Sequence, residues 1–324
     1  MTGSQVTEDV VDWVAELLGQ RIGLRAEPTV RGRLRRCIRD EATDHGLDLE
    51  AYLHTIAARG SAFESLLDRV TVQETGFFRH PEHFRVLVSD VLPTLQPPVR
   101  FWSTGCANGQ EAFSLAIVLE EQGMDGWVVA TDLSTKALRR TAAGRYTGRE
   151  LSGLSPERAA RYLTRSGHGW EVTGSLRNRV VVLRHNLIDP FPDEVRSCQV
   201  VFCRNVLIYI SHRHSRLFLQ RVADTVAPAA LFLGSAEAIW PVSDRFEVVR
   251  IGDTFVHRPK PAATVHSGPT GPGPVNTGSG RGAPGPVTAR GARLAAGTPA
   301  PAAQPAPPAQ PAQPAPPVAL AERL

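Results

Sequence analysis

The sequence predicts an α/β protein with a mostly parallel β-sheet, and three observations support this fold class. Short apolar runs alternate with helical patterns between residues 99 and 234, which is typical of a parallel sheet covered by helices on both faces. A glycine-containing turn joins the first of these runs to a helix. The pattern ends with two runs, residues 246–251 and 254–257, joined at Gly252-Asp253, which predicts an antiparallel hairpin.

The first 70 residues predict a small helical domain. Residues 8–18 carry apolar side chains on one helical face, and Pro28-Thr29 opens a second helix. Two further helices follow, with inward-facing residues Leu49, Tyr52, Leu53 and Ile56 in one, and Phe63, Leu66, Leu67 and Val70 in the other.

The helix that begins at Pro28 carries a basic row, defined as Arg31, Arg35 and Arg39. These residues recur every fourth position, on a face away from the apolar stripe of the helix. Such a row is a solvated helix face or a docking strip for an acidic partner helix. The residues alone leave both interpretations open.

The turn between the first strand and its helix predicts a ligand site. Residues 99–102 form a buried strand, and Gly105 and Gly109 allow the backbone to approach a ligand closely. The spacing matches neither a dinucleotide nor a phosphate-binding loop. The next strand, residues 127–130, is followed by Asp132, whose carboxylate can accept hydrogen bonds from ribose hydroxyls. A nucleoside such as S-adenosylmethionine fits this pattern, and the alternative is a turn glycine and a capping Asp that bind no ligand.

The remaining elements continue the alternation. Ser155-Pro156 begins a capped helix, and residues 170–173 and 179–183 predict strands of a small antiparallel unit. Residues 200–203 predict a buried strand, and a helix with Leu217, Leu219, Val222 and Val226 leads to a strand at residues 231–234. An aromatic segment, residues 71–79, and a helix through Leu92 precede the first strand.

Composition separates a tail from the folded part. From Pro259 onward the chain holds 16 of its 26 prolines and no Phe, Trp, Tyr, Ile or Cys, which predicts disorder for residues 259–324. The tail has five of the 36 basic residues and one of the 32 acidic ones, so the folded part has 31 of each. This balance does not favour nucleic-acid binding.

The four cysteines have neither paired C-x-x-C spacing nor a nearby His, so no metal site is expected. The opening residues are polar, and no apolar run reaches membrane-spanning length, so we expect no membrane insertion. We also expect a cytoplasmic location and a monomer.

The motifs together resemble the CheR family of chemoreceptor glutamate methyltransferases, over residues 6–258. The resemblance implies a helical domain (1–70), an S-adenosylmethionine-dependent Rossmann-like methyltransferase domain (71–258) and a small β-subdomain within about residues 144–182. The motifs that carry it are Gln73-x-Thr75-x-Phe77-Phe78-Arg79, Trp102-Ser103-x-Gly105-Cys106-Ala107-x-Gly109-x-Glu111, Ala130-Thr131-Asp132, Asn186-Leu187, Phe202-Cys203-Arg204-Asn205-Val206-x-Ile208-Tyr209 and Gly234-Ser235-Ala236-Glu237.

The resemblance also implies the site. Arg79 suits the methionine carboxylate, Asp132 the ribose and Asn186 an adenine edge, and Tyr209 either lines the methyl-transfer site or is a core aromatic residue. We count Arg79 and Tyr209 as catalytic candidates. The cofactor-binding candidates are Gln73, Thr75, Arg79, Gly105, Glu111, Asp132, Asn186, Leu187, Arg204 and Asn205.

The implied activity is transfer of a methyl group from S-adenosylmethionine to glutamate carboxylates of a chemoreceptor-like coiled coil, with the basic row as its docking strip. A glutamate acceptor is already ionised at neutral pH, so the lack of a general-base signature agrees with this activity. Two alternatives remain: a methyltransferase of the same fold with another acceptor, and a cofactor-binding signalling module with altered or lost catalysis. The second follows from Gln73, where the family usually has Asn, and from the altered motif at Gly234.

Overall fold

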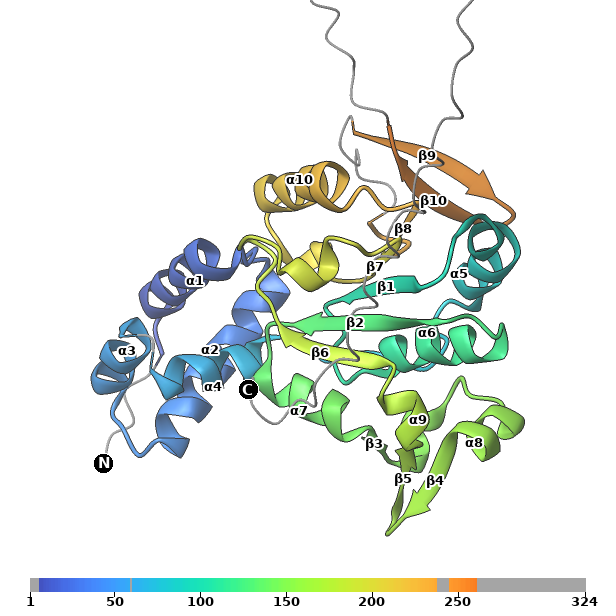
Figure 1. Cartoon of the computed structure of the whole chain (residues 1–324). Helices are drawn as coiled ribbons and strands as arrows, with labels where there is room; N and C mark the ends of the chain where they lie inside the picture. The colour runs from blue at the N-terminus through green and yellow to red at the C-terminus, as the bar shows by residue number, and fades with distance from the viewer. Residues whose placement is uncertain (1–5, 59, 238–244, 261–324) are drawn as a thin grey trace, which may run out of the picture. The chain divides into compact units, whose positions relative to one another are not determined.

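A seven-stranded sheet forms the centre of the computed structural model, which describes residues 6–58, 60–237 and 245–260. Its strand order is β6-β2-β1-β7-β8-β10-β9, in which the first five strands are parallel and the last two antiparallel (Figure 1). The predicted fold class is therefore confirmed. The strands are β1 (Val99–Thr104), β2 (Gly126–Asp132), β6 (Val180–Arg184), β7 (Val200–Cys203), β8 (Ala230–Leu233), β9 (Phe246–Ile251) and β10 (Thr254–Pro259).

Alternating side chains of the central strands pack into two separate apolar clusters, one on each face of the sheet. In β1, Phe101 packs with the cluster of α5, α6 and α7, whereas Trp102 packs with the cluster of α10. This two-residue period is the expected geometry of a strand buried on both faces. The covering helices are α5 (Pro81–Val86), α6 (Gln110–Glu121), α7 (Thr135–Ala143) and α10 (His212–Arg221), and π-helical turns (Leu87–Val91 and Val222–Val226) extend α5 and α10.

Four helices precede the sheet and share an apolar cluster of their own. Thr7 and Asp48 cap two of them by accepting backbone N–H groups, as the sequence pattern favours. An isolated bridge between Leu24 and Ile210 connects this part to the segment after β7. The helices are α1 (Glu8–Ile22), α2 (Pro28–Asp44), α3 (Leu49–Ala57) and α4 (Ser61–Val70).

A second, three-stranded antiparallel sheet lies between α7 and β6, with the order β3-β5-β4 (Figure 1). One sequence expectation here is wrong. The run at residues 179–183 was expected in the small antiparallel unit, but β6 pairs in parallel with β2 at the edge of the main sheet. The elements are β3 (Arg145–Tyr146), α8 (Pro156–Tyr162), β4 (Leu163–Ser166), β5 (Gly169–Val172) and α9 (Gly174–Arg177).

Among the described residues, no helix is both long and apolar enough to cross a membrane. A tail was expected from Pro259 onward, but Pro259 is part of β10 and Lys260 donates its backbone N–H to the carbonyl of Arg245. Residues 261–324, the rest of that expected tail, lie outside the described part of the chain.

Candidate functional site

A cavity of about 270 Å³ opens where β1, β2, β6 and β7 end. The strand order reverses between β1 and β7, and in open α/β sheets ligands bind at this switch point beyond the carboxyl ends of the strands. Helices α1 and α2 and the segment after α4 close the opposite side. The lining residues include Ile22, Leu24, Thr29, Val30, Arg33, Gln73, Gly105, Ala107, Asp132, His185, Asn186, Leu187, Arg204, Asn205, Val206 and Tyr209.

The turn after β1 forms one wall of the cavity. Gly105 has a φ of 68°, and a Cβ there would lie 2.5 Å from a methyl group of Val206, so no larger residue fits without displacing the loop after β7. The N–H of Ala107 donates to Asp132 Oδ2 at 2.9 Å and holds this turn against the end of β2. Gly105 lines the cavity, and the lack of a side chain there leaves its backbone open to the cavity space.

Asp132 is 9% exposed and lines the cavity. It is the last residue of β2, not a residue beyond it as expected. Its Oδ1 accepts the N–H of Ser134 at 2.9 Å, so each carboxylate oxygen holds one backbone donor and keeps a lone pair for a ligand. Burial raises the pKa of Asp132, and the backbone hydrogen bonds counter this effect.

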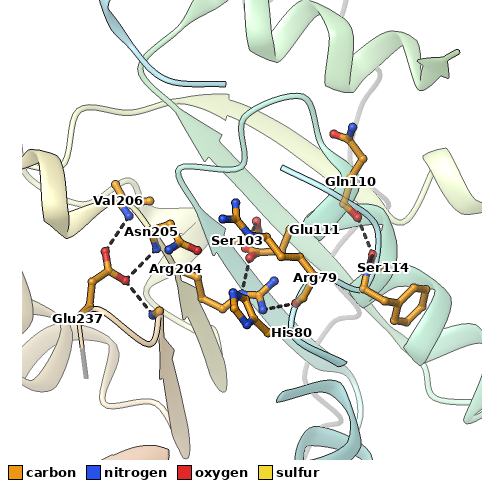
Figure 2. Close-up of polar contacts among 12 residues, drawn as sticks. Arg79, His80, Ser103, Gln110, Glu111, Ser114, Arg204, Asn205, Val206 and Glu237 are labelled. Carbon is orange, nitrogen blue, oxygen red and sulfur yellow. Dashed lines mark hydrogen bonds and ion pairs between the residues drawn. The ribbon is translucent and has the colours of Figure 1, made fainter. Parts of the chain in front are cut away.

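A buried ion pair lies beside the cavity (Figure 2). Arg204 Nε is 2.8 Å from Glu111 Oε2, and Ser103 Oγ donates to Glu111 Oε1 at 2.7 Å. Arg204 also donates to the backbone carbonyl of Arg79. Arg204 lines the cavity and Glu111 does not, and the Arg204 side chain is only 2% exposed, so Glu111 and the Arg79 carbonyl hold the guanidinium in the interior behind the cavity wall.

The segment from Gln73 to Arg79 contributes less to the cavity than expected. Gln73 lines the cavity, and its buried Oε1 has no hydrogen-bond partner among the described residues. Thr75 and Arg79 are not among the lining residues, and Arg79 instead pairs with Glu74 at 3.2 Å. The cofactor and catalytic roles predicted for Thr75, Arg79 and Glu111 stay predictions, as do those of the predicted residues that line the cavity.

The loops after β6 and β7 supply the remaining predicted residues. Asn186 and Leu187 both line the cavity, but the Asn186 amide already donates to the backbone carbonyl of Arg21 at 2.9 Å. An adenine edge would compete with that bond or use the remaining amide atoms. Asn205 and Tyr209 also line the cavity. Asn205 has a φ of 60°, a left-handed conformation that is rare for a residue with a side chain.

Sequence reasoning missed three residues of this region. Arg33 faces the cavity from α2, one turn after Thr29 and Val30, but in the sequence it is one arginine among many. His185 is buried with an unpartnered Nδ1, and burial lowers its pKa. Glu237 binds the loop after β7, and its place in the Gly234-Ser235-Ala236-Glu237 motif was the available signal.

The cavity fits a nucleoside cofactor by its chemistry. Gly105 leaves room for close backbone approach, Asp132 offers acceptors for ribose hydroxyls, and the buried Gln73 oxygen lacks a donor. The wall formed by Ile22, Leu24, Val30 and Leu187 is apolar and suits a base. No group of three or more His, Cys, Asp or Glu residues within the described ranges is placed to hold a metal ion.

Comparison with known proteins identifies the family. Residues 73–255 match the model of the CheR methyltransferase, SAM binding domain. The chain is 36% identical over 220 residues to chemotaxis protein methyltransferase 1 of Pseudomonas aeruginosa, covering 62% of this chain and 79% of the relative. It is 34% identical to chemotaxis protein methyltransferase Cher2 of Pseudomonas putida, with the same coverage, and 32% identical to the chemotaxis protein methyltransferase of Vibrio parahaemolyticus, covering 60% and 75%. The chain belongs to the CheR methyltransferase family, and its cofactor is S-adenosylmethionine.

Proposed function

We propose that this methyltransferase transfers a methyl group to glutamate side chains of a chemoreceptor-like coiled coil in the cytoplasm, giving glutamate methyl esters. The observation that carries the proposal is the placement of Arg33 and Tyr209 on the wall of the cofactor cavity. A cation and a phenol at this position suit an anionic acceptor that must be aligned rather than deprotonated. The names of the curated relatives support an acceptor from chemotaxis.

Arg33 is available to guide a carboxylate. Its Nη1 makes a 3.4 Å contact with the carbonyl of Val70, and the described part of the chain offers its guanidinium no carboxylate. Tyr209 is half-buried, and its backbone carbonyl accepts the N–H of Arg25, which ties the loop after β7 to the connection between α1 and α2. The two side chains would bind and orient the acceptor carboxylate.

The bound cofactor supplies a methyl group on a sulfonium, which is electrophilic without further activation. A glutamate with a pKa of about 4.3 is ionised at neutral pH, so no residue of this chain has to remove a proton. The chain's contribution is alignment, and effective molarity from alignment is worth roughly 7–11 kcal/mol. Asp132, Gly105 and Arg204 would hold the cofactor in place while Arg33 and Tyr209 hold the acceptor.

The basic row is our proposed docking strip for the receptor. In the structure Arg31 pairs with Glu8 and Asp12 of α1, Arg35 pairs with Glu8, and Arg39 pairs with Asp40. Exposed ion pairs contribute only about 0–1 kcal/mol, so an acidic receptor helix can replace these partners. Attraction between the row and such a helix would raise the encounter rate and would weaken beyond about 8 Å at physiological salt.

The test is methylation of a receptor cytoplasmic fragment with radiolabelled S-adenosylmethionine. We expect base-labile label on the fragment, lost when its acceptor glutamates are replaced by glutamine. Tyr209→Phe and Arg33→Gln should lower the turnover more than they lower cofactor affinity. Label that resists base, or transfer to another residue type, would assign a different acceptor. Cofactor binding without any transfer would identify a signalling module.

A charge reversal tests the docking strip. Arg35→Glu with Arg39→Glu should slow methylation of the fragment at low salt, and less at high salt, with unchanged cofactor affinity. Arg213 and Arg216 are exposed on α10, and reversing both is the matched control. Equal effects of the two double reversals would mean that the basic row is a solvated face.

A further inference from the structure

Glu237 lies at the end of a tight turn after β8, with its carboxylate buried under the loop that follows β7. It is 1% exposed, and its N–H donates to the carbonyl of Gly234 at 2.8 Å, which closes the turn. The carboxylate accepts hydrogen bonds from five backbone N–H groups at 2.7 to 3.3 Å, some of them drawn in Figure 2. These donors are Asn205, Val206, Leu207, Ile208 and Gly234.

The bonded loop is the part of the chain that brings Arg204, Asn205, Val206 and Tyr209 to the cofactor cavity. Asn205 is held in the left-handed region at a φ of 60°, a conformation that is uncommon for residues other than glycine but that Asn adopts more readily than most. The Asn205 N–H is 2.8 Å from Glu237 Oε2. The Glu237 carboxylate is therefore placed to stabilise the left-handed conformation of Asn205.

The site is built for a carboxylate on this turn. A Cβ at Gly234 would lie 2.7 Å from Glu237 Oε2 and 2.9 Å from the nitrogen of Asn205, so glycine is required for the close approach. A carboxylate has lone pairs for several donors, whereas a glutamine amide would present its own N–H groups to backbone N–H groups. Burial raises the pKa of Glu237, and the backbone donors counter this by favouring the charged form.

We infer that Glu237 is a positioning residue for the methyltransferase reaction, acting through the Asn205–Tyr209 loop to hold Asn205 and Tyr209 in their places at the cofactor cavity. It touches neither the cofactor space nor the acceptor space, since it is not among the residues that line the cavity. The effect of Glu237 on Tyr209 matters for the acceptor and therefore rests on the proposed function. Its effect on Asn205 matters only for cofactor binding and does not depend on the acceptor.

Calorimetry with S-adenosylhomocysteine tests the inference without any acceptor. Glu237→Gln should weaken binding roughly tenfold or more, because several charge-assisted hydrogen bonds are lost. Glu41→Gln is the matched control, because Glu41 is also 1% exposed but pairs with Arg69 among the N-terminal helices. The control should lower the melting temperature and leave the affinity unchanged. Equal loss of affinity in both variants would overturn the inference.

Hydrogen exchange and chemical rescue separate positioning from general stability. In Glu237→Gln, exchange should accelerate at the five donor amides and remain slow in β1 and β2. In Glu237→Ala, added formate should restore part of the affinity by occupying the vacated anion site, and it should not affect Glu41→Ala. Parental exchange at the five amides, or no rescue by formate, would contradict the assignment.

If Glu237→Gln does not fold, Gly234→Ala is the second variant, because its methyl group pushes on the same oxygen and the same loop. It should weaken S-adenosylhomocysteine binding in the same direction, and parental affinity would overturn the inference. A parent chain that binds the cofactor but methylates no receptor fragment would refute the proposed acceptor and leave this result intact.

Discussion

At the scale of single residues, Asp132 serves both the fold and the site, because its carboxylate binds two backbone N–H groups and faces the cavity. Asp132→Asn should weaken S-adenosylhomocysteine binding about 10- to 100-fold, since charge-assisted hydrogen bonds are worth roughly 1.5–3 kcal/mol each. Calorimetry measures this effect. Asp48→Asn is the control, because Asp48 also accepts a backbone N–H but caps α3. Equal affinity of Asp132→Asn and the parent would remove Asp132 from the cofactor site.

His83 predicts a pH dependence of stability. It is 4% exposed, and burial, then the charge of Arg204 and the neighbouring His80 and His257, lower its pKa to about 3. In the unfolded chain the pKa is about 6.5, so the unfolded state binds more protons between these values and stability falls as the pH drops from about 6.5 towards 3. His83→Phe should flatten the melting temperature between pH 7 and 5.5. An unchanged slope in the variant would contradict this assignment.

The sequence could predict which residues lie at the strand ends, whereas their roles at the cofactor stay predictions. Gly105 and Asp132 follow or end parallel strands, and the carboxyl ends of such strands meet at one edge. Arg79 shows what a sequence does not reveal, because its guanidinium pairs with Glu74 a few residues earlier. Choice among nearby partners depends on side-chain rotamers and on backbone strain, such as the left-handed Phe78 and His80 that flank Arg79.

At the scale of elements, the small antiparallel sheet is coupled to the cavity segment through Gly153. Its φ is 96°, and a Cβ would lie 2.1 Å from the carbonyl oxygen of Phe77. Gly153→Ala should therefore displace residues 73–79, lower the melting temperature and weaken cofactor binding. Gly167→Ala is the matched control, with a φ of 56° and no atom within 4 Å of its Cβ. It should cost about 1–2 kcal/mol of conformational strain and leave binding unchanged. Similar affinity losses in both variants would argue against the coupling.

The assignment of β6 marks the limit of element prediction. An apolar run of this length suits an edge strand of the main sheet as well as a strand of a small antiparallel unit. Only the strand with which it pairs decides to which sheet it belongs. That partner, β2, lies about 50 residues earlier, where Val128 faces Val180. The start of α1 at Glu8 agrees with the expectation, and its cap Thr7 acts within the first turn, whereas the helix continues to Ile22, beyond the expected residues 8–18.

At the scale of the whole molecule, three apolar clusters cover the described residues: one for the N-terminal helices and one for each face of the main sheet. Hydrophobic periodicity was sufficient to predict these layers, because each helix or strand must bury its own apolar stripe. The cavity lies where residues of α1 and α2, such as Ile22, meet the strand ends. Sequence motifs indicated the strand-end side, and the contribution of α1 and α2 required the structure.

Pro259 pairs with Phe246 in the terminal hairpin, and Lys260 donates its N–H to the carbonyl of Arg245, so the folded part extends at least to Lys260. Truncation after Lys260 should leave the melting temperature and cofactor affinity unchanged, because the removed sequence has almost no large apolar residues to bury. Truncation after Arg258 should lower the melting temperature, since it removes the Lys260 N–H bond and the last pairing position of an edge hairpin. Scanning calorimetry of both chains and the parent tests the boundary. A loss of several degrees on cutting after Lys260 would show that the removed segment packs against the methyltransferase.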